Sequence, residues 1–254
     1  MGALHAGHTS LITEATRKSE LTIVSIFVNP TQFGKNEDLS RYPRPIQSDI
    51  AHLEQAKTSI LFLPTPEDIY PNGIGNTTIV SVPGISTLWC GHTRPGHFDG
   101  VTSIVARLLT LIQPTYAFFG EKDFQQFTII KKMVQDLFIP TQLIPCPIIR
   151  ESDGLAMSSR NRYLSASERK TAIQLFQTLT LMQAHYKNGE KSAQTLIKIG
   201  KNNLQKNSDI ALDYLTIVNP ETLQERPQDI TPGDRLLIAA YVGSTRLIDN
   251  IKMV

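Results

Sequence analysis

The spacing of apolar residues divides the first half of the chain into short strands and amphipathic helices. Apolar runs of strand length, rich in β-branched side chains, cover residues 21–28, 59–63, 116–119 and 141–144, and residues 77–82 (TTIVSV) also favour extended structure. Apolar positions at helical spacing predict helices over residues 10–19, 46–56, 99–112 and 124–137. Strands that alternate with helices predict βαβ units, so we expect an α/β fold with a Rossmann-like, mainly parallel sheet.

The pattern changes near Ile149. The run Ser165-Ala-Ser-Glu168 is a capping-box signature and predicts a helix that continues to about residue 186. A second helix is expected over residues 192–204, followed by strands over residues 212–218, 235–242 and 247–254. The last two strands flank a short hairpin connection. We therefore expect a domain of residues 1–149 and a smaller α+β domain with antiparallel strands, residues 150–254.

Composition narrows the class of protein. The chain has 254 residues and a formal net charge of +2, which argues against a strongly basic nucleic-acid binder. Apolar runs stay well short of the ~18 residues that a membrane span needs. Two cysteines, Cys90 and Cys146, cannot form a disulfide framework and favour a reducing compartment. We expect a cytoplasmic globular protein without a nucleic-acid or membrane partner.

The strongest local motif is His5-Ala6-Gly7-His8 at the start of the first predicted helix. Residues three apart on a helix share a face, so both imidazoles lie beside the free N–H groups of the helix N-terminus. Such groups suit an anion, and imidazoles there can donate hydrogen bonds to phosphate as charge develops. The alternative is two surface histidines that merely cap a helix.

A second motif follows the change of pattern. Ser158, Ser159 and Arg160 lie in a Gly-containing segment, DGLAMSSRNRYL, where hydroxyls and guanidinium groups can form a mobile clamp for phosphate oxygens. Without the other motifs, this segment would be interpreted as a solvated loop before the capped helix.

A third motif, FFGEKDFQQ, follows a predicted buried strand, at the sheet edge where ligands bind in open α/β folds. Lys122 can balance phosphate charge and Asp123 can accept from ribose hydroxyls. The alternative is an ordinary strand–helix connection with a salt-bridged pair.

The loop Asn29-Pro30-Thr31-Gln32-Phe33 follows another predicted strand. Its carboxamides can recognise a small polar substrate by directed hydrogen bonds, although Asn-Pro alone indicates only a turn.

Two other chemistries are disfavoured. Cys90, His92, His97 and Cys146 lack the paired spacing of a zinc site. No serine has the nucleophile-elbow context of a Ser-His-Asp hydrolase.

Together these segments closely resemble the pantothenate synthetase family, also called pantoate–β-alanine ligases, which belongs to the nucleotidylyl transferases with a His-x-Gly-His signature. The resemblance is carried by MGALHAGH, SIFVNPTQF, YPR, GHFDGV, FFGEKDFQQ, DGLAMSSRNRYL and TRLIDNI. It implies that ATP, with Mg²⁺, drives the condensation of pantoate with β-alanine to pantothenate, a step of vitamin B5 and coenzyme A biosynthesis. The reaction would pass through pantoyl adenylate and release pyrophosphate and AMP.

The resemblance also implies roles for single residues. His5 and His8 would stabilise the transferring phosphoryl group, and the β- and γ-phosphates would be held by Lys122, Ser158, Ser159 and Arg160. Gly120 and Asp123 would bind ribose, and Met157 would seat the adenine. Gln32 and Gln126 would bind pantoate, with Met1 lining the pocket shared with ATP. Asp49 would lie near the metal, while Arg94 and His97 remain unassigned pocket candidates.

The resemblance further implies a homodimer, and a C-terminal domain that acts as a lid over the adenylate. Family members carry a strand before Met-Gly-Ala-Leu-His, central in the nucleotide-binding sheet. This chain has no such strand, so we expect that its start is misplaced or truncated. The alternatives are another adenylyl transferase of this superfamily, a relative of the aminoacyl-tRNA synthetases, or a truncated nucleotide-binding protein without turnover.

Overall fold

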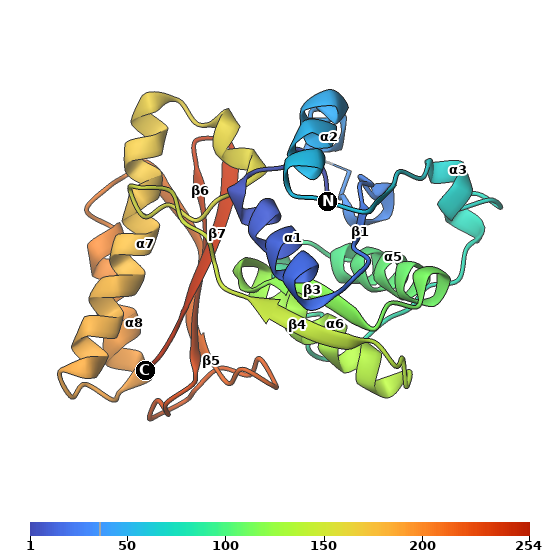
Figure 1. Ribbon diagram of the computed structural model, residues 1–254. Coiled ribbons are helices and arrows are strands. Elements are labelled where there is room, and N and C mark those ends of the chain that lie inside the picture. Colours follow the sequence, from blue (N-terminus) through green and yellow to red (C-terminus); the bar gives the residue numbers. More distant parts are fainter. Residues whose placement is uncertain (36) are drawn as a thin grey trace. The chain divides into compact units, whose positions relative to one another are not determined.

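The structure, a computed structural model, describes residues 1–35 and 37–254 (Figure 1). The chain folds into two compact units, one made of Met1–Glu121 and Gln125–Pro147 and the other of Lys122–Phe124 and Ile148–Val254. None of the helices in the described part of the chain is long and apolar enough to cross a membrane. Each unit combines helices with its own β structure.

The strands of the first unit are parallel, as the alternation of strands and helices predicts. β1 (Ile23–Ser25) pairs with β2 (Ile60–Phe62), and β3 (Tyr116–Gly120) pairs with β4 (Gln142–Cys146). Among the described residues these pairs form two small parallel sheets of two strands each, rather than one continuous sheet.

Met1 lies along the edge of β1 that faces away from β2. Its nitrogen donates to Ser25 O at 2.8 Å, and its carbonyl accepts from Phe27 N at 3.2 Å. This is the hydrogen-bond pattern of parallel pairing opposite Ile26, whose own N–H donates to Phe62 O at 2.9 Å on the β2 side. The segment before His5 is thus held by strand-type bonds.

Four long helices accompany these strands, at α1 (Ala6–Lys18), α2 (Ile46–Gln55), α5 (His97–Ile112) and α6 (Phe124–Asp136). Shorter helical turns cover Pro30–Gln32, Asp38–Ser40, α3 (Pro66–Ile69), Ile74–Asn76, α4 (Cys90–Thr93) and Glu121–Asp123. A buried cluster joins α1, α2 and β1 through Leu4, Ile12, Val24, Ile26 and Leu53. Burial of this apolar surface fixes the start of α1 against β1.

The extended segment predicted at residues 77–82 is not a strand. Side chains of α5 take up its main-chain groups instead, since Ser103 Oγ accepts from Val80 N at 2.9 Å and Thr102 Oγ1 donates to Val80 O. Ser81 Oγ also donates to Asp99 at 2.7 Å. An extended segment that lies along a helix can show the same alternation of apolar residues as a strand. The spacing of apolar residues alone therefore does not distinguish the two.

The second unit is a three-stranded antiparallel sheet packed against two helices, as expected. β6 (Arg235–Val242) lies between β5 (Ile210–Val218) and β7 (Thr245–Lys252). α7 (Ala166–Lys187) and α8 (Ala193–Leu204) lie side by side in Figure 1, and both contribute to the core beneath the sheet. A short 3₁₀ helix, Ser159–Tyr163, precedes α7.

The predicted capping box of α7 is confirmed. Ser165 Oγ accepts from Glu168 N at 3.3 Å, and Glu168 Oε2 accepts from Ser165 N at 2.8 Å. Two N–H groups at the helix N-terminus are therefore satisfied reciprocally.

Replacement of the cap tests its contribution to stability. Ser165→Ala should lower the free energy of unfolding by about 1 kcal/mol, because one orphan N–H of α7 loses its acceptor. Urea denaturation followed by circular dichroism measures this change. Ser208→Ala, at an exposed serine in the turn before β5, should leave the midpoint unchanged, and an equal loss in both variants would contradict the interpretation.

Candidate active site

The two histidines of the first motif lie together at the N-terminus of α1. Their ring centroids are 4.0 Å apart, and His5 is the N-cap residue. His5 Nδ1 accepts from Gly7 N at 3.1 Å, so in the neutral ring the proton lies on Nε2. The Nε2–H group is thereby a hydrogen-bond donor of fixed direction beside the positive end of the helix dipole.

Asp49 of α2 holds the segment that leads into these histidines. Its Oδ2 accepts from Ala3 N at 2.8 Å and its Oδ1 from Leu4 N at 2.7 Å. Ala3 has a φ of 50°, a left-handed conformation that is unfavourable for a residue with a Cβ. Asp49 is only 1% exposed, so its carboxylate stabilises a strained turn from within the protein interior.

This arrangement does not fit the metal-binding role that the resemblance implies for Asp49. Both carboxylate oxygens already accept main-chain hydrogen bonds, and the group is buried. Within residues 1–35 and 37–254, no three His, Cys, Asp or Glu side chains gather as a metal site would require. The bonds of Asp49 favour a structural role instead, in which it satisfies orphan N–H groups.

Gln32 lies in the 3₁₀ turn after β1, and its main chain is held by His97 and Arg94, the two unassigned pocket candidates. His97 Nδ1 contacts Gln32 O at 2.7 Å, and Arg94 Nη1 contacts His97 Nε2 at 2.8 Å. Because a guanidinium only donates and a carbonyl only accepts, His97 is the neutral tautomer protonated on Nδ1. Arg94 also donates to both oxygens of Glu37, at 2.7 and 2.6 Å.

The electrostatics of this group follow from burial and pairing. Burial opposes ionisation of Glu37, but the hydrogen bonds and charge of Arg94 outweigh it and lower the pKa of that carboxyl. The pair therefore stays charged around neutral pH. Arg94 and His97 are thus positioning residues for the Gln32 turn.

Asn29 of the same loop has a structural role that the sequence did not reveal. Its Oδ1 accepts from Tyr70 OH at 2.6 Å, and its Nδ2 donates to Gly100 O at 3.0 Å. A Cβ at Gly100 would overlap the carbonyl of Thr31, so only glycine lets α5 approach this loop so closely. Gly100 lies in the segment GHFDGV, which carried the family resemblance but did not by itself indicate this contact.

The two adjacent glutamines of α6 differ in function. Gln125 is buried and holds the turn around Trp89, accepting from Cys90 N at 3.1 Å and donating to Ile85 O and Leu88 O. Gln126 is half-buried and follows it in the helix. Of the pair, Gln126 is the more exposed.

The segment after β3 crosses from the first unit into the second. Gly120 ends β3 opposite Cys146, and a Cβ there would meet nothing within 4 Å, which leaves space at the strand end. Lys122 Nζ lies 3.9 Å from Asp123 Oδ1, with both side chains partly exposed. A cation and a carboxylate thus follow the carboxyl end of a parallel strand, where ligands bind in α/β folds.

The Met157–Arg160 loop belongs to the second unit and is anchored at both ends. Met157 N donates to Ile149 O at 3.0 Å, and Ser158 Oγ accepts from Arg160 N at 3.3 Å as the cap of the 3₁₀ helix. Ser159 is buried, and beyond the loop Asn161 Nδ2 donates to Glu151 at 2.8 Å. The loop expected to be a mobile clamp therefore has fixed ends.

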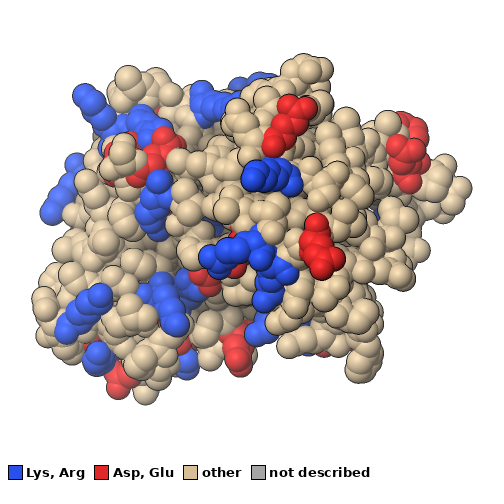
Figure 2. Space-filling view, viewed as in Figure 1, with Lys and Arg blue, Asp and Glu red and all other residues tan. Residues whose placement is uncertain are grey.

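The structure thus groups the expected site residues by unit. Near the start of α1 it brings together His5, His8, Asp49 and Met1, and it places Gln32 with Arg94 and His97. In the second unit it brings Lys122 close to Asp123 and places Met157, Ser158, Ser159 and Arg160 in one loop. Figure 2 shows basic and acidic side chains interspersed over the visible face, in keeping with the near-neutral net charge.

Paired histidines at the N-terminus of α1, beside parallel strands, give this α/β protein a place that suits an anion such as a phosphate group. The family model "Pantoate-beta-alanine ligase" matches residues 1–252. The chain belongs to this family.

The names of similar proteins support membership of this family. A pantothenate synthetase of Acetivibrio thermocellus is 45% identical over 99% of this chain and 88% of its own length. A bifunctional pantoate ligase/cytidylate kinase of Thermosynechococcus vestitus is 47% identical over 98% of this chain, which spans about half (49%) of that longer protein.

Solved structures show the same fold. Pantothenate synthetase from Thermus thermophilus superposes with a TM-score of 0.96 at 43% identity, covering 100% of this chain and 91% of that one. Pantoate-beta-alanine ligase from Francisella tularensis, complexed with beta-gamma ATP and beta-alanine, has a TM-score of 0.80 at 35% identity, with 100% and 87% covered.

The role of Asp49 can be tested directly. Asp49→Asn turns an amide N–H toward a main-chain N–H, so the turn at Ala3 should relax and the ligation rate should fall by at least about 10-fold. The Mg²⁺ concentration that gives half-maximal rate should not change. Steady-state kinetics at varied Mg²⁺ measure both, and a shifted Mg²⁺ dependence would show that Asp49 is a metal ligand after all.

Proposed function

We propose that the protein joins pantoate to β-alanine at the expense of ATP, giving pantothenate, AMP and pyrophosphate by way of pantoyl adenylate. The family match over residues 1–252 supports this activity, and the observation that carries the mechanism is the histidine pair at the N-terminus of α1. The Francisella relative, which was solved with beta-gamma ATP and beta-alanine, agrees with two of the substrates.

In the first step, a carboxylate oxygen of pantoate attacks the α-phosphorus of ATP, and the bond from that phosphorus to the bridging oxygen of pyrophosphate breaks. Negative charge grows on the phosphoryl oxygens and on the leaving group. The Nε2–H of His5 and the imidazole of His8 donate to these oxygens, with the N-terminal dipole of α1 behind them. Positioning and charge stabilisation supply the acceleration.

The nucleotide is held by residues that follow β3 and by the Ser-Ser-Arg loop. Lys122, Ser158, Ser159 and Arg160 bind the β- and γ-phosphates, and Gly120 and Asp123 bind the ribose. Met157 seats the adenine through its main chain. Mg²⁺ belongs to this scheme as part of the MgATP substrate, because the Asp49 carboxylate is already occupied.

Pantoate is bound by amides of the first unit. Gln32 and Gln126 hydrogen-bond its hydroxyl and carboxylate, and Met1 lines the same pocket and the adjoining ATP site. His97 contacts the main-chain carbonyl of Gln32 and is itself held by Arg94, so the backbone that carries the Gln32 side chain is fixed.

In the second step, the β-alanine amine attacks the acyl carbon of the adenylate. The carbon–nitrogen bond forms, the bond to the AMP oxygen breaks and the amine loses a proton. No covalent bond to the enzyme is required, in keeping with the lack of a nucleophile-elbow serine in the sequence. We also propose a homodimer in a reducing cytoplasm, where the buried thiols of Cys90 and Cys146 stay reduced.

A pyrophosphate-release assay tests the activity. With MgATP, sustained release should require both pantoate and β-alanine, because the adenylate must be consumed for turnover. Pyrophosphate release that does not depend on pantoate would indicate another adenylyl transferase. ATP binding without any pyrophosphate release would indicate a nucleotide-binding protein. Either result would overturn the proposal.

The role of His5 in catalysis can be separated from its role as a helix cap. His5→Ala should reduce adenylate formation by at least ~10²-fold. His5→Asn restores a good N-cap but not the imidazole, so it should stay as slow as His5→Ala while recovering thermal stability. Single-turnover adenylate formation and melting curves measure the two effects; recovery of the rate in His5→Asn would make His5 a structural cap.

A further inference from the structure

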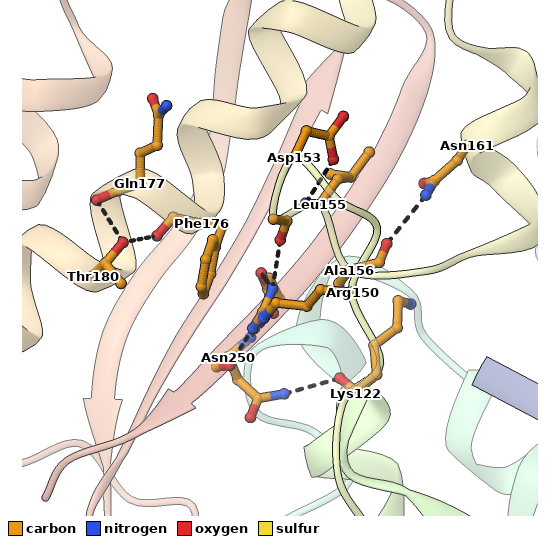
Figure 3. Close-up of polar contacts among 12 residues, drawn as sticks. Lys122, Arg150, Asp153, Leu155, Ala156, Asn161, Phe176, Gln177, Thr180 and Asn250 are labelled. Carbon is orange, nitrogen blue, oxygen red and sulfur yellow. Dashed lines mark hydrogen bonds and ion pairs between the residues drawn. The ribbon is translucent and has the colours of Figure 1, made fainter. Parts of the chain in front are cut away.

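Strand β7 contacts the Lys122 segment directly and, through Arg150, the hairpin that leads into the Ser158–Arg160 loop. The proposed function assigns the Lys122 segment and that loop to the phosphates. Asn250 Nδ2 donates to Lys122 O at 3.0 Å, and this contact is drawn in Figure 3. The guanidinium of Arg235 lies 4.1 Å from the centroid of the Phe124 ring, two residues further on. The Lys122–Phe124 segment thus contacts the sheet at two points, through the Lys122 carbonyl and through the Phe124 ring.

The neighbouring residue of β7, Asp249, holds the hairpin that precedes the Ser158–Arg160 loop. Asp249 forms a bidentate pair with Arg150, with Nη1–Oδ2 at 2.6 Å and Nη2–Oδ1 at 2.9 Å. Arg150 Nη1 also donates to Gly154 O at 3.1 Å, and its guanidinium lies 3.8 Å from the centroid of Phe176 (Figure 3). Arg150 therefore joins β7, α7 and the turn at Gly154.

That turn leads directly into the Ser-Ser-Arg loop. Residues 149–157 form a small hairpin, closed by the bridge of Arg150 with Ala156 and by Met157 N to Ile149 O. Gly154 has a φ of 93°, and a Cβ there would lie 2.6 Å from Phe176 Cδ1. The hairpin packs closely against Phe176 at Gly154. The position of Arg150 therefore determines the position at which the chain enters the Ser158–Arg160 loop.

The polar groups of Asp249 and Asn250 are buried and oriented. The two residues are 5% and 2% exposed, and Asp249 Oδ1 accepts from Asn250 N at 2.7 Å. Arg235 Nη1 donates to Asn250 Oδ1 at 3.3 Å, which leaves Nδ2 to face the Lys122 carbonyl. Burial raises the pKa of Asp249, while the ion pair with Arg150 and the charge of Lys122 act in the opposite direction.

We propose that Asp249 and Asn250 are positioning residues that hold the Lys122 segment and the Ser158–Arg160 loop at adjacent points of one strand. This inference rests on the proposed function, because that function assigns the two segments to ATP. When hydrogen-bond donors from two segments bind the same triphosphate, the distance between these donors must be kept to within about 0.5 Å. A shared strand achieves this, since two segments far apart in sequence cannot then shift independently. The TRLIDNI motif, which the ligation chemistry leaves without a role, acquires one.

The test removes each contact and measures ATP binding without turnover. Asn250→Ala should raise the dissociation constant for ATP about 5-fold, as loss of one hydrogen bond predicts. Asn250→Asp keeps the acceptor for Arg235 but loses the donor to Lys122 O, so it should show at least the same loss. In steady state, the KM for ATP should rise and the KM for β-alanine should stay within about 2-fold. Wild-type ATP affinity in Asn250→Asp would overturn the proposal.

A matched control lies on the same sheet. Asp213 of β5 pairs with Arg246 of β7 at 2.7 Å, an ion pair that joins the two strands to each other. Asp249→Asn should weaken ATP binding at least about 10-fold, because Arg150 loses its buried partner, whereas Asp213→Asn should not change ATP binding. Equal losses in both variants would mean that a weakened sheet explains the effect. If Asp249→Asn does not fold, the Asn250 variants still decide the matter.

The outcome also separates this inference from the proposed function. If the wild-type protein ligates its substrates while the Asn250 variants bind ATP normally, only the positioning role fails. If the wild-type protein binds ATP without ligation and the Asn250 variants lose affinity, the positioning role stands and the proposed function fails.

Discussion

The buried carboxylate of Asp49 is the constraint on which the first unit depends. A carboxylate taken from water into the interior is costly unless hydrogen bonds satisfy it, and Asp49 meets that requirement with the N–H groups of Ala3 and Leu4. The same bonds stabilise the left-handed Ala3, and so they determine where α1 begins. His5 and His8 therefore have their positions before any ligand binds. Preorganisation of this kind is what catalysis by charge stabilisation requires.

In the second unit, ion pairs hold the segment that leads into the Ser-Ser-Arg loop, as Asp49 holds the segment before His5 in the first unit. The hairpin before the Ser-Ser-Arg loop is held on one side by Arg150 with Asp249, and on the other by Arg169, which reaches Glu151 at 2.8 Å and Asp153 at 2.7 Å. Hydrogen bonds and charge from Arg169 outweigh burial and lower the pKa of both carboxyls. Glu151 and Asp153 are about a quarter to a third exposed, so these pairs serve position more than stability. In both units, buried or half-buried carboxylates thus hold the segments next to the proposed site residues.

The element order and the motifs can be predicted from the sequence because apolar period and capping chemistry are local signals. The capped helix α7, the antiparallel strands and the parallel pairing of the first unit follow from such signals. The extended structure predicted at residues 77–82 does not become a strand, because the partners of that segment, Thr102 and Ser103, are side chains of a helix some twenty residues away. The surroundings of Asp49 are hidden for a related reason: a carboxylate's place in the sequence does not show whether a metal or a pair of N–H groups faces it.

The histidine motif shows why a site can be recognised from sequence while its mechanism cannot. His-Ala-Gly-His predicts an anion site, but only the bond from Gly7 N to His5 Nδ1 determines which ring nitrogen carries the proton. Nδ1 of His5 caps the helix, and Nε2 carries the proton that can be donated. The bond that caps α1 therefore also determines the tautomer of His5. The same logic holds for His97, where Arg94 and the Gln32 carbonyl leave a single neutral form. In both cases a main-chain contact determines which ring nitrogen carries the proton. The proposed reaction depends on such placement, because it forms no covalent bond to the enzyme.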